Sequence, residues 1–246
     1  EIGSGLVGSE MCIRDRNISV MSKLYKKTLL YCYLIKYVNR IENLLKRRTL
    51  HKNAAEILNQ LNLVFKELNY DYWLEFGTLL GAVRENRIIS FDLDLDIATW
   101  RFNYGDNLNV VMQRYGFKLM REIYIENEGI EQTYSFNNVN VDVFYCDKLD
   151  DDWIKCYVFY LDKNMSIDDM NRIYGGLHPL EIRLPFNNLL TYSFLGVDTK
   201  IPANYKSQLS YHYGTDYMIP NPNWDYRNAS SSKQIPNKIG KVRFFQ

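Results

Sequence analysis

One short segment constrains this chain more than any other, because acidic and apolar residues alternate through positions 91–97 (Phe-Asp-Leu-Asp-Leu-Asp-Ile). In an extended strand, successive side chains point to opposite faces. Asp92, Asp94 and Asp96 are therefore predicted to share one face, with the apolar residues packed on the other. Carboxylates at this spacing repel one another unless a cation lies among them, and Mg²⁺ favours oxygen ligands from one or two carboxylates plus substrate phosphates. The segment therefore indicates a cation-binding strand, with a solvated edge strand as the simpler alternative.

The residues before this strand favour a phosphate site. Positions 73–84 read Trp-Leu-Glu-Phe-Gly-Thr-Leu-Leu-Gly-Ala-Val-Arg, an apolar strand followed by a Gly-Thr turn and a short helix. The backbone N–H groups of Gly77 and Thr78 can bind an anion, although the pair could also serve as a turn and helix cap. Arg84 can bind phosphate bidentately or pair with a nearby acid. Glu75 and Asp92 are candidate supporting groups beside the ligands, or ordinary outward-facing acids.

A third carboxylate lies on a later predicted strand. Two Asn residues at 137–138 separate residues 134–136 from residues 139–145, a pattern typical of a hairpin turn. In the second strand Val139, Val141 and Val143 share one face, so Asp142 lies on the other. We expect this strand to neighbour the acidic one, which would bring Asp142 to the same site.

These motifs, in this order, resemble the LicD/fukutin family of the nucleotidyltransferase-like superfamily. The matching residues are the segment Gly77-Thr78-Leu79-Leu80-Gly81, then Arg84, Asp94-Leu95-Asp96 and Asp142. A later Pro-x-x-Tyr and Tyr-Gly pattern, at 202–205 and 213–214, extends the resemblance over about residues 52 to 224. The resemblance implies an α/β (α+β) fold, with a nucleotidyltransferase-like mixed β-sheet flanked by helices and, here, an N-terminal helical extension.

The resemblance also implies an activity. Members of the family transfer a phospho-alcohol, such as phosphocholine or ribitol phosphate, from a CDP-activated donor to a glycan hydroxyl. It follows that Asp94, Asp96 and Asp142 would be catalytic residues that bind Mg²⁺ (or Mn²⁺), with Asp142 as third ligand or general base. Gly77, Thr78 and Arg84 would contact the donor phosphates. Two alternatives stay open: nucleotidyl transfer to a small-molecule or sugar acceptor, and a catalytically silent module that binds or assembles glycans.

Composition excludes several other classes. The 246 residues carry a formal net charge of +1, which argues against a nucleic-acid binder with a globally basic surface. The four Cys residues form no Cys-x-x-Cys pair, so we expect neither a zinc site nor a disulfide framework. No His residue clusters with the acids in the sequence, so a His general base is not indicated. No apolar run is long enough for an uncomplicated transmembrane helix.

The organisation along the chain follows from these patterns. Residues 1–20 resemble, over positions 6–16, a translated sequencing adapter, and we expect an artefact and disordered leader before a native start at Met21. Residues 21–51 form a basic helical extension that either packs on the domain or lies on an anionic membrane through 21–52. Residues 52–227 form the catalytic domain, with a helix over 52–69, and residues 228–246 a flexible tail. The absence of a recognisable signal favours the cytoplasm or the cytoplasmic face of a membrane, with the Golgi lumen as the alternative if an anchor has been lost.

Overall fold

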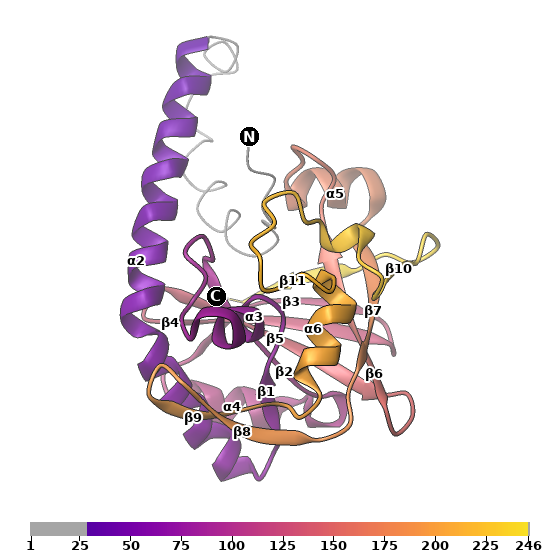
Figure 1. Cartoon of the computed structure of the whole chain (residues 1–246). Coiled ribbons are helices and arrows are strands. Elements are labelled where there is room, and N and C mark those ends of the chain that lie inside the picture. The colour runs from indigo at the N-terminus through magenta and orange to yellow at the C-terminus, as the bar shows by residue number, and fades with distance from the viewer. Residues whose placement is uncertain (1–28, 246) are drawn as a thin grey trace.

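The computed structural model describes residues 29–245, so the predictions for residues 1–28 lie outside it. Its architecture is a curled mixed sheet flanked by helices, which confirms the predicted fold class (Figure 1). The helices are α2 (Leu29–Leu68), α3 (Phe76–Glu85), α4 (Asp106–Arg114), α5 (Ile167–Tyr174) and α6 (Tyr205–Tyr213). The strands are β1 (Tyr72–Leu74), β2 (Asp94–Trp100), β3 (Lys118–Ile125), β4 (Gly129–Phe136), β5 (Val139–Lys148), β6 (Trp153–Tyr160), β7 (His178–Pro185), β8 (Leu189–Phe194), β9 (Val197–Pro202), β10 (Ser232–Gln234) and β11 (Lys241–Phe244).

The main sheet gathers nine of the strands formed by residues 29–245. Its long path runs β10-β7-β6-β5-β4-β3-β11, and β8 and β9 form a separate hairpin. β2 joins the sheet through a parallel pairing with β5, and β1 pairs antiparallel with β2. The other pairings of the main sheet are antiparallel, including the predicted hairpin of β4 and β5. Asn137 and Asn138 both have positive φ (48° and 62°), the conformation that a two-residue hairpin turn requires.

Helix α2 crosses the predicted boundary at residues 51 and 52 without a break. Its second half buries one face completely in the main hydrophobic core, through Leu50, Ala54, Ile57, Leu58 and Leu61. The helix ends where predicted, since Asn69 adopts a left-handed conformation (φ 52°) immediately after Leu68. The extension and the first domain helix are therefore one rod, whose first half continues beyond the sheet (Figure 1).

The C-terminal segment, predicted to be a flexible tail, contributes two strands to the main sheet. β10 adds to one edge of the main sheet beside β7, and β11 adds to the other edge beside β3. Between them, Leu177 and Gly240 exchange two backbone hydrogen bonds of 2.8 Å. Edge strands gain their order from backbone pairing, which needs no apolar periodicity, and this is why the side-chain pattern did not predict them.

Candidate active site

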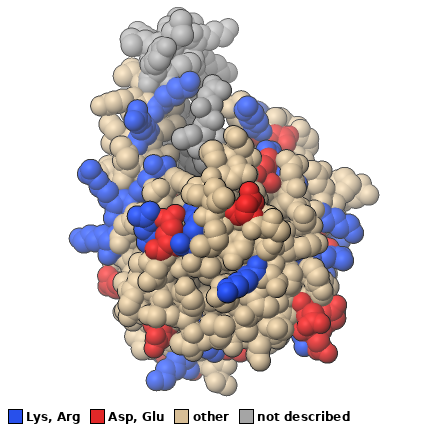
Figure 2. All heavy atoms as spheres, in the orientation of Figure 1, with Lys and Arg blue, Asp and Glu red and all other residues tan. Residues whose placement is uncertain are grey.

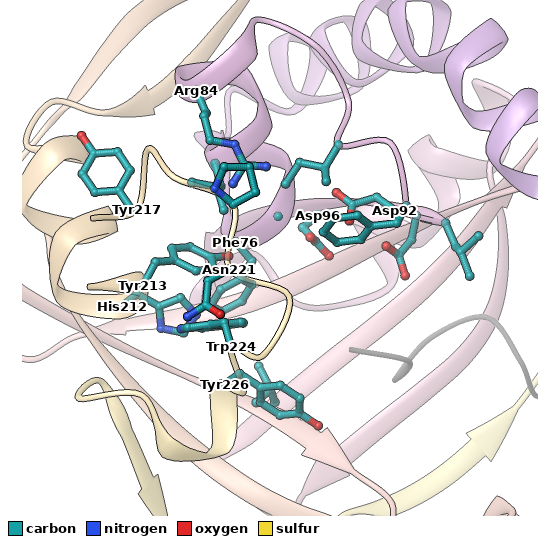
Figure 3. A pocket seen from close by; sticks show the side chains of 18 of the residues that line it. Phe76, Arg84, Asp92, Asp96, His212, Tyr213, Tyr217, Asn221, Trp224 and Tyr226 are labelled. Atoms are coloured by element: carbon teal, nitrogen blue, oxygen red, sulfur yellow. The ribbon is translucent and has the colours of Figure 1, made fainter. Parts of the chain in front are cut away.

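The predicted acidic residues line a cavity of about 540 Å³. Its walls come from helices α2 and α3, the loop before β2, strands β2, β4, β5, β6 and β7, and the segment from the end of α6 to residue 226. Figure 3 shows Asp92 and Asp96 together on one side, an aromatic group with His212 and Trp224 on the other, and Arg84 above them in the view. The cavity therefore joins a charged half to an aromatic half.

The parallel pairing of β2 and β5 brings the three predicted ligands together. Asp96 lies directly opposite Asp142 in the register, and Asp94 lies opposite Asn140. Since side chains alternate along a strand, Asp94 and Asp96 share the face that opens on the cavity. Asp92 also lines the cavity, although it lies in the loop before β2 and not on the strand as predicted. The turn that holds it includes a hydrogen bond from its N–H to the carbonyl of Ile89 (3.0 Å).

The carboxylates of this cluster lack enough positive charge around them. Burial, followed by repulsion from Asp142 and Asp92, raises the pKa of Asp94 well above its usual range. Burial and then repulsion from Asp94 raise the pKa of Asp96 in the same direction. Burial alone raises the pKa of Asp92 to about 7, against a smaller opposite effect of Arg84 and Arg47. The cluster is therefore arranged to receive a cation or a proton.

Asp142 provides a specific sign of such a missing partner. Its side chain is only 5% exposed, and burial raises its pKa although Arg121 and a hydrogen bond from Thr133 oppose the shift. Its Oδ1 atom is buried and has no hydrogen-bond partner among the residues that the structure describes. A buried carboxylate oxygen without a donor is costly in a folded protein, and ligands or ions commonly satisfy such atoms.

The carboxylates at the cavity suit a hard divalent cation that takes the rest of its ligands from water and substrate. Within residues 29–245, no three acidic, His or Cys side chains converge into a ready-made metal cage. Mg²⁺ does not need one, since it usually takes one or two carboxylates and completes its shell with water and substrate phosphates. Asp94 and Asp96, which share one face of β2 at the cavity, supply two such carboxylates, and cation binding by them and by Asp142 stays a prediction.

Two arginines bring positive charge to the cavity from different helices. Arg84 on α3 lines it as predicted, and its Nε also donates to Glu85 Oε1 (3.2 Å). Arg47 on α2 lines it as well, and its buried Nε has no hydrogen-bond partner among the described residues. Arg47 belongs to the predicted basic extension, and its position in the site was not predicted. An arginine with unused donors at a cavity wall can bind phosphate oxygens.

A buried ion pair behind the acidic cluster was also missed. Arg121 on β3 and Glu131 on β4 are almost fully buried, and Arg121 Nη2 lies 3.5 Å from Glu131 Oε1. The same nitrogen donates to Thr133 Oγ1 (2.9 Å). Burial and then the charge of Asp142 raise the pKa of Glu131 to about 8. Arg121 is the buried cation that partly neutralises Asp94 and Asp142, and nothing in the local sequence pattern distinguishes it from an exposed strand residue.

Gly77 and Thr78 have different positions in the site. Thr78 is buried, and its Oγ1 accepts a hydrogen bond from the N–H of Asp96 (2.8 Å), so its side chain fixes the acidic strand to α3. Gly77 lines the cavity, and a Cβ atom there would lie 3.1 Å from Asp92 Oδ2 and 3.2 Å from Asp96 Oδ2. The first-turn N–H groups of a helix have no acceptor within the helix, which keeps phosphate contact by the Gly-Thr backbone as a prediction.

Glu75 supports the structure and does not line the cavity. It caps α3 by accepting from the N–H of Phe76 (3.2 Å), and its carboxylate also accepts from Trp73 Nε1 (2.8 Å) and Gln208 Nε2 (2.6 Å). Burial raises its pKa to about 7 in spite of these donors. Glu75 therefore ties β1, α3 and α6 together beneath the site.

The aromatic half of the cavity comes from residues outside the predicted site. His212, Tyr213 and Trp224 form a cluster with ring centroids 4.4 to 5.1 Å apart, and Phe76 packs 5.4 Å from His212. His212 lines the same cavity as the acids, which corrects the view that no His is near them. Burial lowers its pKa to about 3, so the ring is neutral, and its Nδ1 lies 2.5 Å from Ser231 Oγ. A neutral aromatic surface of this kind suits the stacking of a planar ring.

The sequence of this domain also matches a known protein family. The model of the LicD/FKTN/FKRP nucleotidyltransferase domain matches residues 69–204, more than half of the chain. The chain belongs to this family. The matched range contains Gly77, Arg84, Asp94, Asp96 and Asp142, and the predicted membership is thereby confirmed. His212, Tyr213, Trp224 and Arg47 lie outside the matched range.

Individual relatives in the family are distant. The chain is 22% identical over 211 residues to "Ribitol-5-phosphate transferase FKTN" of Mus musculus, covering 85% of this chain and 42% of that protein. It is 22% identical over 202 residues to the Homo sapiens protein of the same name, covering 82% and 41%. An uncharacterized protein of Rickettsia typhi, RT0683, is 39% identical over 88 residues, covering 32% and 28%. This chain therefore spans about two-fifths of the length of the FKTN proteins that it matches.

Proposed function

We propose that this protein transfers a phospho-alcohol group from a CDP-activated donor to a carbohydrate hydroxyl, in a reaction that depends on Mg²⁺ or Mn²⁺. The observation that carries the proposal is the meeting of Asp94, Asp96 and Asp142 in a cavity that two arginines also line. Family membership supports transfer of a phosphate-containing group. The name of the FKTN relatives favours ribitol phosphate over phosphocholine as the group transferred here.

The proposed roles follow from position. In phosphoryl transfer a protein acts mainly by positioning the reactants and neutralising developing charge. Asp94 and Asp96 would hold the cation, which when bound would neutralise charge on the donor diphosphate. Arg84, Arg47 and the backbone at Gly77 would bind the remaining phosphate oxygens, and the preorganised donors would stabilise the transition state.

Asp142 is the proposed general base. Its Oδ1 has no other partner among the described residues, and its raised pKa makes it a better proton acceptor than an exposed Asp. The acceptor hydroxyl would lose its proton to this carboxylate while its oxygen attacks the phosphorus that carries the alcohol. The bond between the two phosphates breaks, and CMP leaves. The aromatic group around Trp224 would bind the cytosine ring by stacking.

Nucleotidyl transfer is the second candidate, because the same carboxylates would serve it. The acceptor would then attack the phosphorus that carries cytidine, and the alcohol phosphate would leave. Incubation with CDP-ribitol or CDP-choline, Mg²⁺ and a panel of glycans separates the candidates by mass spectrometry. Release of CMP with a phospho-alcohol on the glycan supports the proposal, and release of the alcohol phosphate with CMP on the glycan supports nucleotidyl transfer. A folded protein that forms neither product supports the silent glycan-binding module.

Asp142→Asn is the informative variant for this assay, and Asp198→Asn on β9 is its matched control. Asp198 is an exposed strand carboxylate outside the cavity. We expect product formation to fall by about 10²- to 10⁴-fold in the first variant and to stay unchanged in the second. The cellular location, cytoplasmic or at a membrane face, stays a prediction.

A further inference from the structure

The first half of α2 carries an apolar stripe that no other described part of the chain covers. Its members are between 40% and 65% exposed, and they recur at the three- and four-residue spacing that places side chains on one helix face. They are Leu34, Tyr37, Val38, Ile41, Leu44 and Leu45. An apolar face of this length is unusual on a protein surface and marks an interaction site.

The stripe faces away from the domain and from the cavity. Asn43, which lines the cavity, follows Leu34 by about two and a half turns of helix and so lies on the opposite side. The next residues on the side of Asn43 are Arg47, also at the cavity, and the fully buried Leu50 and Ala54. One face of α2 thus packs on the domain while the reverse face, nearer the N-terminus, displays the stripe. Figure 1 shows this half of α2 projecting past the sheet.

Positive charge is dense along this part of α2, on the face of the stripe and on the faces beside and behind it. Residues 34–52 contain one acid, Glu42, and six basic residues: Lys36, Arg40, Lys46, Arg47, Arg48 and Lys52. Arg48 and Lys52 follow Leu34 by about four and five turns, so they continue the face of the stripe toward the C-terminus. In Figure 2, which keeps the orientation of Figure 1, blue side chains gather along the side of the molecule that α2 occupies.

We propose that this face of α2 binds an anionic membrane surface, with the stripe inserted at the level of the lipid headgroups. An apolar helix face bordered by Lys and Arg is the pattern of a helix that lies in the interface. In the part of the chain that the structure describes, no helix is long and apolar enough to cross a bilayer. Because Asn43 and Arg47 are on the other side of α2, the bound protein keeps its cavity open to solution.

A second copy of the chain fits this face less well. Among the side chains that the structure describes, the stripe runs over residues 34–45, which is shorter than the about three heptads of apolar contacts that a coiled coil requires. Pairing two such helices would also bring two strongly basic segments together, whereas anionic headgroups neutralise them. Charge complementarity therefore selects the lipid surface.

Flotation of the full chain with lipid vesicles tests the proposal without any assay of transfer. We expect binding to phosphatidylcholine vesicles that contain about one-third phosphatidylserine, at least about tenfold weaker binding to pure phosphatidylcholine, and loss of binding in high salt. The variant Leu34→Gln, Ile41→Gln, Leu45→Gln should lower the affinity for the anionic vesicles by about tenfold or more. The variant Arg48→Glu, Lys52→Glu should do the same through charge alone.

The matched control makes the same kind of substitution elsewhere: Leu63→Gln, Val110→Gln, Ile173→Gln. These residues are 46%, 54% and 53% exposed, and the control should bind vesicles like the unaltered protein. Circular dichroism establishes that each variant is folded. Equal vesicle binding by the stripe variant and the control would overturn the proposal, as would no binding of the unaltered protein. A dimer in light scattering that the stripe variant alone converts to a monomer, with no lipid binding, would assign the stripe to a second copy.

Discussion

The carboxyl group of Glu75 should make stability depend on pH in a way that one substitution reveals. Burial raises its pKa from an ordinary value of 4.5 to about 7, and the folded protein therefore binds this proton more tightly than the unfolded chain. Below pH 4.5 the carboxyl group is protonated in both the folded and the unfolded state, so it does not affect stability. As the pH rises from 4.5 to 7, the unfolded chain loses the proton first, and the folded state therefore loses stability. The change stops once the group is ionised in both states.

The magnitude follows from the shift. A difference of 2.5 pKa units (7 minus 4.5) corresponds to about 3 kcal/mol, of which about 2.5 kcal/mol develops between pH 5 and pH 8. Glu75→Gln removes the titration and keeps the size of the side chain. From pH 5 to pH 8, we expect the difference in free energy of unfolding, unaltered protein minus variant, to fall by about 2.5 kcal/mol.

Urea unfolding of both proteins at several pH values measures this difference in free energy. If the variant loses the hydrogen bond from Trp73 or Gln208, the difference changes by an amount that is the same at every pH. The slopes of the unfolding curves should agree, so that the midpoints report stability. A difference that stays flat between pH 5 and pH 8 would refute the account of Glu75 as a buried carboxyl beneath the site.

Four further predictions concern the cavity and helix α3 beside it. Asp142→Asn should raise the free energy of unfolding of the metal-free protein by about 0.5–2 kcal/mol in urea titrations at pH 8, because it removes an acid whose pKa burial raises from a crowded acidic cluster. Gly77→Ala should lower kcat/KM by about tenfold or more with little change in stability, since its Cβ would press on Asp92 and Asp96. Gly81→Ala makes the same substitution later in α3, where the Cβ would lie 2.6 Å from the carbonyl oxygen of Arg87. The free energy of unfolding of this variant should fall by about 1–3 kcal/mol in the same titrations. Trp224→Ala should weaken CDP binding by about tenfold in calorimetry through lost stacking, and equal affinity would exclude the aromatic half from nucleotide binding.

The sequence alone predicted the features that depend on local spacing. Alternation placed Asp94 and Asp96 on one face, and the expectation that the strand of Asp142 neighbours theirs is confirmed by the parallel pairing of β2 and β5. The Asn pair at 137–138 predicted the hairpin, because few residues adopt positive φ as readily.

Features that depend on tertiary contacts could not be predicted in this way. Arg47 reaches the cavity because α2 continues unbroken across the expected boundary, and Arg121 is buried because its strand pairs with β4. The role of Glu75 depends on Gln208, a contact across 133 positions of the chain. The periodicity of a single segment does not predict these contacts between distant parts of the chain.

Calorimetric titration of CDP, with and without Mg²⁺, tests the central claim most directly. The proteins to compare are the unaltered chain, Asp94→Asn and the control Asp198→Asn, each shown to be folded. The account predicts CDP binding that requires Mg²⁺ in the unaltered protein and the control, and that is lost in Asp94→Asn. Absence of CDP binding by the folded, unaltered protein in the presence of Mg²⁺, or metal-dependent binding that survives in Asp94→Asn, would contradict it.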